Sequence, residues 1–202
     1  MGMSDLLGDP VEVARRRAAL LGPPMRPIAL FAARIRHETG RPVPDADPAD
    51  GGVEARVLML LERPPPAVQR VGFVSRDNAT PTARNIRRFT SAAGLSRRST
   101  LIWNAVPWMD TDPSVARLPL RVEAVRAGLL WLPPLLALLP RLEVVVLAGR
   151  VARLAADILR SGRPRLQVLM MPHPSPTIVC TSPRIGHDIM TTLGTAAAMV
   201  RD

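Results

Sequence analysis

The stretch LQVLMMPHPSP, residues 166–176, is the part of the chain from which the rest is interpreted. Its apolar half, 166–171, predicts a buried strand of a parallel sheet. The prolines on both sides of His173 restrict the backbone and favour extended geometry before each of them. His173 is therefore expected on a stiff loop just past the carboxyl end of a strand, which is the edge where open α/β sheets bind ligands.

Three more apolar runs predict strands of the same kind, and helical patterns alternate with them. The strands are expected at 57–61, 100–106 and 144–148. Helices are expected at 80–93, 121–138, 149–158 and 185–199, with a break at Pro133-Pro134 and with Leu154 facing the core. This alternation predicts an α/β three-layer sandwich, in which helices flank a central four-stranded parallel sheet.

The length of 202 residues favours one domain, 1–202, with a single core. Residues 1–52 are expected to add two short helices and then an exposed connector, 40–52, that is rich in proline, aspartate and glycine. Nothing in this part of the sequence suggests catalysis.

The composition limits the classes of function. The net charge of +10 is carried by arginine without any lysine, and this basicity favours a phosphate-rich partner such as a nucleic acid. A GC-rich coding sequence explains the absent lysine but not the excess of arginine over acidic residues. One cysteine, Cys180, cannot form an internal disulfide or hold a cysteine-ligated cluster. We expect no metal, no cofactor and no membrane span, and a cytoplasmic location.

Polar side chains follow the ends of three different predicted strands. Glu62, Asn104 and His173 each lie within a few residues of such an end, so the sheet should bring them to one crevice. A carboxylate, a carboxamide and a histidine can together orient water, read the edge of a planar ligand and stabilise negative charge. For each there is also a plain structural alternative, such as an exposed ion pair of Glu62 with Arg63.

These residues resemble the uracil-DNA glycosylase superfamily over roughly residues 54–190. HPSP at 173–176 matches the signature that carries the catalytic histidine, and VLMLLERP at 57–64 looks like the first signature. The segment 72–95 is similar to the loop and helix with the stacking phenylalanine, and 102–104 to the strand with the base-pairing asparagine. The matches come in the expected order, and the lack of four cysteines points to a member without an iron-sulfur cluster.

The resemblance implies roles for individual residues. The catalytic candidates are His173, Glu62 and Asp77, with the choice between the two carboxylates open. The candidates for binding the substrate are Phe73, Asn104, Arg63 and Ser75. The candidates for contacts to DNA are Ser175, Thr177, Ile178 and Arg84, and Thr177 or Ile178 occupies the region of the wedge that enters the duplex.

The expected function is that of a DNA repair enzyme that flips uracil out of single- or double-stranded DNA and hydrolyses its N-glycosidic bond. We expect it to act as a monomer. Relatives have a small residue and a glycine where Arg63 and Pro65 stand, so a catalytically weak or silent DNA-binding module is the alternative. A hydrolase of free nucleosides is a third hypothesis.

Overall fold

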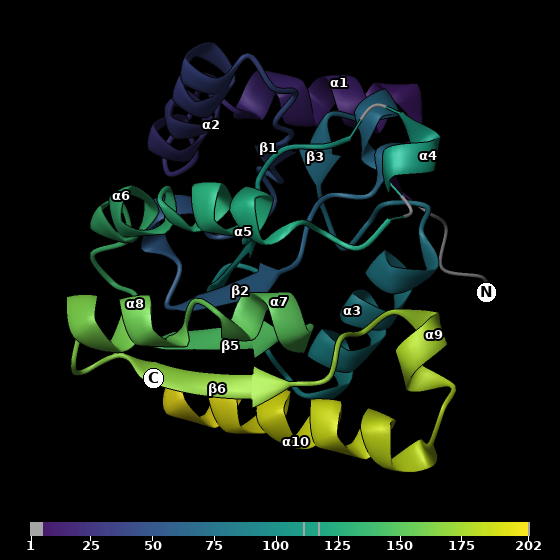
Figure 1. Cartoon of the computed structure of the whole chain (residues 1–202), viewed down its shortest axis with the longest axis vertical. Helices are drawn as coiled ribbons and strands as arrows, with labels where there is room; N and C mark the ends of the chain where they lie inside the picture. Colours follow the sequence, from purple (N-terminus) through teal and green to yellow (C-terminus); the bar gives the residue numbers. More distant parts are fainter. Residues whose placement is uncertain (1–5, 111, 117, 202) are drawn as a thin grey trace.

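The computed structural model describes residues 6–110, 112–116 and 118–201. Figure 1 shows a layered α/β molecule whose elements follow one another along the chain. The strands are β1 Asp45–Ala46, β2 Val57–Leu61, β3 Phe73–Val74, β4 Thr100–Asn104, β5 Val144–Ala148 and β6 Gln167–Met171. The helices are α1 Pro10–Ala19, α2 Arg26–Thr39, α3 Pro81–Ala92, α4 Pro113–Ala116, α5 Val122–Leu129, α6 Leu132–Ala137, α7 Gly149–Arg153, α8 Ala156–Gly162, α9 Pro176–Val179 and α10 Pro183–Met199. Short 3-10 turns are η1 Leu6–Gly8, η2 Gly52–Glu54 and η3 Pro66–Arg70.

The main sheet is parallel throughout, with the strand order β4-β2-β5-β6. Its register pairs Leu61 with Asn104 and Ala148 with Met171, so the strands end at nearly the same level. This confirms the predicted fold class. The strands β1 and β3 form a separate two-stranded parallel sheet.

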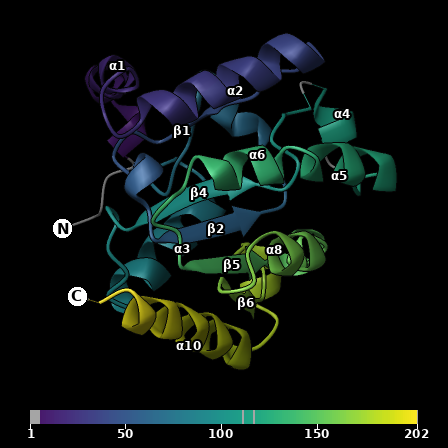
Figure 2. The same cartoon turned by 90° about the vertical axis from the view of Figure 1, so that its left-hand side faces the viewer.

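The strands β2, β4 and β5 are buried along their whole length, which explains their apolar sequences. In β2, Leu58 and Leu60 join the core cluster that also holds residues of α2, α5, α6 and α8, while Val57 and Met59 join the cluster with residues of α3 and α10. Figure 2 shows these two layers of helices on opposite sides of the sheet.

The order of the strands creates a switch point between β2 and β5. The chain leaves β2 through α3 to reach β4 on one side, and it leaves β5 through α7 and α8 to reach β6 on the other side. Neighbouring strands whose connections diverge leave a crevice at their carboxyl ends, where ligands of open α/β sheets bind. The residues after β2 and β5 therefore stand at the expected edge.

Several local predictions are wrong. The break in the helical segment 121–138 falls at Leu130 and Trp131, because Pro133 and Pro134 fit the first turn of α6. Leu154 lies between α7 and α8 and is exposed rather than inward. The strand β6 lies at an edge of the sheet, and Met171 is the one buried residue in it, so the segment is less buried than its apolar sequence predicts.

The connector 40–52 is not the exposed segment that the sequence suggests. Asp47 and Asp50 are completely buried, and Asp45–Ala46 pairs with Phe73–Val74. The segment is polar because its aspartates contact arginines inside the protein, as described below. No helix of the described residues is long and apolar enough to cross a membrane.

The packing of α5 against the end of β4 yields a test of the fold. A Cβ added at Gly128 would come within 2.3 Å of the Ala105 carbonyl oxygen, whereas a Cβ at Gly194 in α10 meets nothing within 4 Å. We expect Gly128→Ala to destabilise the protein by about 1–3 kcal/mol. Gly194→Ala, the matched control, should stabilise it by about 0.5–1 kcal/mol, since alanine favours a helix interior. Urea unfolding measures both, and equal effects of the two substitutions would contradict this packing.

Candidate active site

A small cavity lies at the carboxyl ends of β2 and β4, next to α3. Its volume is about 120 Å³, and its polar lining residues are Arg63, Ser75, Asn78, Thr80, Thr82, Asn104 and His173. Apolar side chains such as Ile86 and Ile102 line the remainder. An engineered protein cavity of about 150 Å³ binds benzene, so this cavity has the size for one small planar ring.

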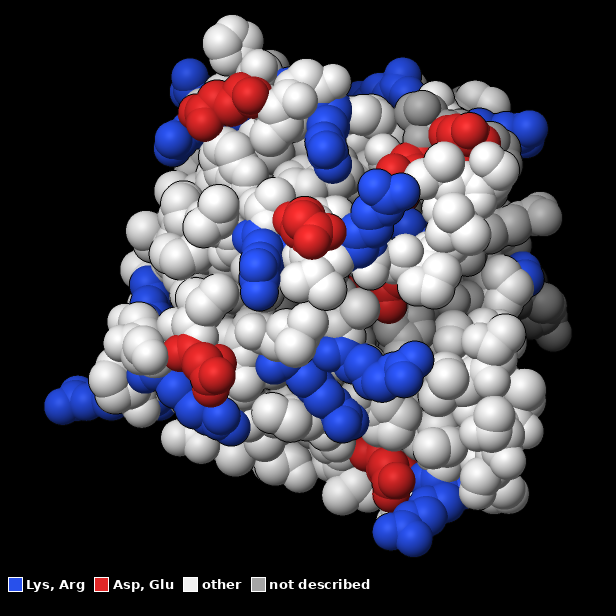
Figure 3. All heavy atoms as spheres, viewed as in Figure 1, with Lys and Arg blue, Asp and Glu red and all other residues white. Residues whose placement is uncertain are grey.

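A wider groove of about 800 Å³ shares Arg63, Pro65 and His173 with the cavity. Its other lining residues include Glu62, Gly149, Arg150, Arg153, Ser175 and Ile178. Figure 3 shows basic side chains gathered over the middle of this face, where Figure 1 places α7. His173 thus stands where a ring-sized cavity meets an arginine-bearing groove.

The position of His173 is fixed by its own loop. The Ser175 backbone N–H donates a hydrogen bond of 3.1 Å to His173 Nδ1, so the neutral ring carries its proton on Nε2. Burial lowers the pKa of the imidazole from its ordinary value, which favours this neutral form near pH 7. The loop presents a hydrogen-bond donor rather than a base.

Two neighbouring elements hold the histidine loop from outside. Asn85 in α3 donates from Nδ2 to the Pro174 carbonyl oxygen at 2.9 Å. Gly149, at the end of β5, has a φ of +88°, and a Cβ added there would lie 3.0 Å from His173 Cβ. A side chain at this position would therefore be strained and would crowd the imidazole.

Asn104 ends β4 and lines the cavity while only 4% of it is exposed. Its Oδ1 is buried without a hydrogen-bond partner. Buried acceptors in folded proteins are nearly always paired, so an unpaired one in a cavity indicates a place where a ligand donates.

Glu62 and Arg63 both follow β2, but they line different parts of the site. Glu62 is half-buried and lines the groove, while Arg63 lines both the groove and the cavity. The Arg63 guanidinium donates to Asp110 Oδ2 at 2.9 Å and to the Leu118 carbonyl oxygen at 2.6 Å. Arg63 therefore fastens the chain around Asp110 and Leu118 at the mouth of the cavity, a partnership that the sequence did not reveal.

Asp77 is part of a buried ion cluster below the cavity. Its Oδ2 accepts hydrogen bonds from Arg16 at 2.7 Å and from Arg97 at 2.6 Å. Asp47 binds the same two arginines and also accepts a hydrogen bond from the Ser75 hydroxyl. Burial opposes the ionisation of Asp77, but the two arginines outweigh it and lower the pKa of this carboxyl.

The ion cluster gives the N-terminal residues before 52 a structural role. Arg16 lies in α1 and Asp47 in the segment 40–52, and together they hold the loop that carries Ser75 and Asp77. The sequence shows the two aspartates at 47 and 50 and arginines far away in the chain, but no local pattern connects these residues. The structure thus brings Ser75 to the cavity but directs its hydroxyl, like the Asp77 carboxylate, toward the cluster.

The remaining predicted residues lie at different places. Phe73 is 1% exposed and lies one residue before the cavity-lining Val74. Ser175 and Ile178 line the groove, and the exposed Thr177 shares a hydrogen bond of 3.1 Å with the Ser175 hydroxyl. Arg84 is exposed and lines a pocket together with Pro176.

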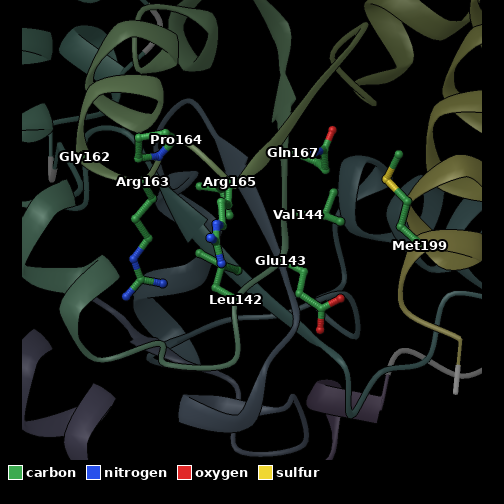
Figure 4. Close-up of a pocket in the computed structure, with 10 residues that line it drawn as sticks. Leu142, Glu143, Val144, Gly162, Arg163, Pro164, Arg165, Gln167 and Met199 are labelled. Carbon is green, nitrogen blue, oxygen red and sulfur yellow. The ribbon is translucent and has the colours of Figure 1, made fainter.

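Figure 4 shows a different pocket, of about 840 Å³, at the amino ends of β5 and β6. Two of its three charged side chains have partners: Arg163 donates to the carbonyl oxygens of Leu136 and Leu139, and Glu143 pairs with Arg56. Within the described residues, no group of three or more His, Cys, Asp or Glu could hold a metal ion.

A comparison with protein-family models matches residues 48–188 to the description "Uracil DNA glycosylase superfamily". The chain belongs to this superfamily. A search of curated proteins found no match. Membership in the superfamily suggests DNA glycosylase activity and a DNA substrate. The matched region contains the lining of both cavity and groove, whereas Arg16 and Asp47 of the ion cluster lie outside it.

Asp50 in the ion cluster makes protein stability depend on pH. Burial raises the pKa of Asp50 to about 7, even though Arg97 Nε lies 3.0 Å and Arg76 Nε 3.8 Å from its Oδ1. The unfolded chain ionises this group near pH 4, so its contribution to the stability of the folded state falls between about pH 4 and pH 7.

We expect Asp50→Asn to remove the loss of stability that the ionisation of Asp50 causes. The stability of the variant relative to the wild type should rise, by up to a few kcal/mol, as the pH increases from about 4 to about 7. Urea unfolding at a series of pH values measures the difference. A difference that stays constant over this range would show that Asp50 ionises normally in the folded protein.

Proposed function

We propose that this superfamily member removes uracil from DNA by hydrolysing the N-glycosidic bond, which leaves an abasic site. The observation that carries the proposal is the junction at His173, where a ring-sized cavity with an unpaired Asn104 oxygen opens into an arginine-bearing groove. A flipped base fits the cavity while the strand lies in the groove.

Base recognition and leaving-group stabilisation fall to the cavity residues. Asn104 forms hydrogen bonds to the edge of the base, which offsets part of the cost of extrusion. His173 donates from Nε2 to the base oxygen on which negative charge develops as the bond to the sugar breaks. The stacking role of Phe73 stays a prediction.

The sugar requires a carboxylate, and we assign this role to Glu62. Cleavage of a glycosidic bond passes through an oxocarbenium-like sugar, which a nearby carboxylate stabilises while it orients the attacking water. Glu62 lines the groove next to the cavity mouth, whereas the Asp77 carboxylate is engaged by Arg16 and Arg97. Asp77 instead supports the loop that forms the cavity wall.

Contacts to the DNA backbone come from the groove and from the histidine loop. Arg150 and Arg153 face phosphates, with Ser175 beside them, and Arg84 extends this basic surface past Pro176. Ile178 is 39% exposed in the groove and is the better wedge, because Thr177 is smaller and more polar.

Base release from uracil-containing oligonucleotides tests the proposal. His173→Ala should lower kcat by about a hundredfold or more, since it removes a preorganised donor to the developing charge. Asn104→Ala should also lower the rate, while His187→Ala, which changes an exposed histidine of α10, should leave it unchanged. The assay uses single- and double-stranded DNA, with free deoxyuridine in parallel.

Two results would contradict the proposal. If the wild type binds DNA normally but releases no uracil, the protein is a DNA-binding module in which Arg63 and Pro65 have altered the first motif. If it cleaves free deoxyuridine but not DNA, it is a nucleoside hydrolase.

The groove arginines yield a prediction on DNA affinity. Arg153→Ala should weaken binding to all sequences alike and lower the slope of log K against log salt concentration by about one unit. Arg160→Ala serves as the control, because Arg160 is an exposed residue of α8 that does not line the groove. Fluorescence anisotropy across a salt series measures both slopes, and an unchanged slope for Arg153→Ala would exclude a phosphate contact there.

A further inference from the structure

We propose that Asn78 is a second base-reading residue, whose Oδ1 accepts a ring N–H of the flipped base and thereby selects deaminated bases. The inference rests on the proposed function, because it assigns a specificity role within the same cavity. Asn78 was not among the residues that the sequence suggested for binding.

The first observation is an unpaired side-chain oxygen on a residue that lines the cavity. Asn78 is only 5% exposed, and its Oδ1 is buried without a hydrogen-bond partner. Its Nδ2 donates to the Phe73 carbonyl oxygen at 2.9 Å. That bond fixes the orientation of the carboxamide, so the atom left for a ligand is the acceptor.

Asn78 is held firmly in this position. It lines the base cavity on one side and, on the other, a wider pocket bounded by α1 and η3. The loop before it is anchored by the ion cluster through Ser75 and Asp77. A rigid wall residue can discriminate between ligands because it cannot turn to suit them.

Three other polar residues of the cavity lining already have hydrogen-bond partners. The Ser75 hydroxyl donates to Asp47 and accepts from the Asp77 N–H, and the Thr80 hydroxyl caps α3 by accepting from the Ala83 N–H. Arg63 is held by Asp110 and the Leu118 carbonyl. Asn78 and Asn104 each keep a buried oxygen without a partner, so the site favours a ligand that offers an N–H group.

This pattern defines a class of substrate. Uracil, hypoxanthine and xanthine each carry a ring N–H next to a carbonyl oxygen. Asn78 Oδ1 accepts that N–H, and Asn104 donates from Nδ2 to the carbonyl oxygen next to it. Cytosine and adenine present a ring nitrogen lone pair at the same position, which would face the Asn78 oxygen without a proton between them. A buried site rejects such a ligand strongly.

Binding of uncleaved DNA tests the inference independently of turnover. The probes are oligonucleotides with one 2′-fluorodeoxyuridine or one 2′-fluorodeoxycytidine, since the fluorine destabilises the oxocarbenium-like transition state and slows cleavage. The wild type should prefer the uracil probe about 10- to 100-fold, and Asn78→Ala should reduce the preference to nearly one. Gln167→Ala, which changes an exposed carboxamide at the amino end of β6 (Figure 4), should keep the wild-type preference.

A second variant separates the acceptor from the bond to Phe73. Asn78→Asp at pH 8 keeps an acceptor at this position but loses the Nδ2 donor, so it should retain a preference for uracil. The inference is overturned if the wild type has no preference, if Asn78→Ala keeps it, or if both variants lose it equally. Base release measured in parallel separates the two proposals. If the wild type releases no base, the proposed hydrolysis is contradicted, while the binding preference still tests the role of Asn78.

Discussion

The parallel register of β2, β4, β5 and β6 is the constraint on which the site depends. Because the strands run in one direction and end at nearly the same level, the residues that follow them reach one edge of the sheet. Asn104 is paired in register with Leu61, the residue just before Glu62. The switch point between β2 and β5 then separates the connecting helices, which leaves room for the groove. One-residue slips in this register would turn Asn104 away from the cavity, since the side chains of a strand alternate between faces.

The buried ion cluster holds the wall of the cavity that the main sheet does not form. Arg16 and Asp47 reach from the N-terminal segment to the loop 75–78, where Ser75 and Asn78 line the cavity. Buried ion pairs add little net stability, because desolvation consumes most of their attraction, but removing one partner leaves a costly buried charge. The cluster is therefore better understood as a device that fixes the position of the loop. It also explains why the region beyond the family match is integral to the fold, since Arg16 and Asp47 lie outside residues 48–188.

The sequence predicted the parts of the molecule that depend on local patterns. Continuous apolar runs identified the strands, Thr80 and Gly94 marked the ends of α3, and the prolines around His173 identified the stiff loop. Contacts between distant segments could not be predicted in this way. The pairing of Arg16 with Asp77, the bond of Arg63 to Asp110 and the packing of Gly149 on His173 join residues that no periodicity connects. For the same reason the sequence could not show that Asp77 contacts Arg16 and Arg97, because these contacts exist only in the folded chain.

We assign the ring-sized cavity to a flipped base and the groove to the DNA strand, with His173 between them. A crystal structure of the protein with a duplex that contains one 2′-fluorodeoxyuridine tests this assignment most directly. We expect an extruded uracil in the cavity, within hydrogen-bond distance of Asn104 and His173 Nε2, and phosphates beside Arg150 and Arg153. A uracil that remains stacked in the duplex, or that lies outside this cavity, would contradict it.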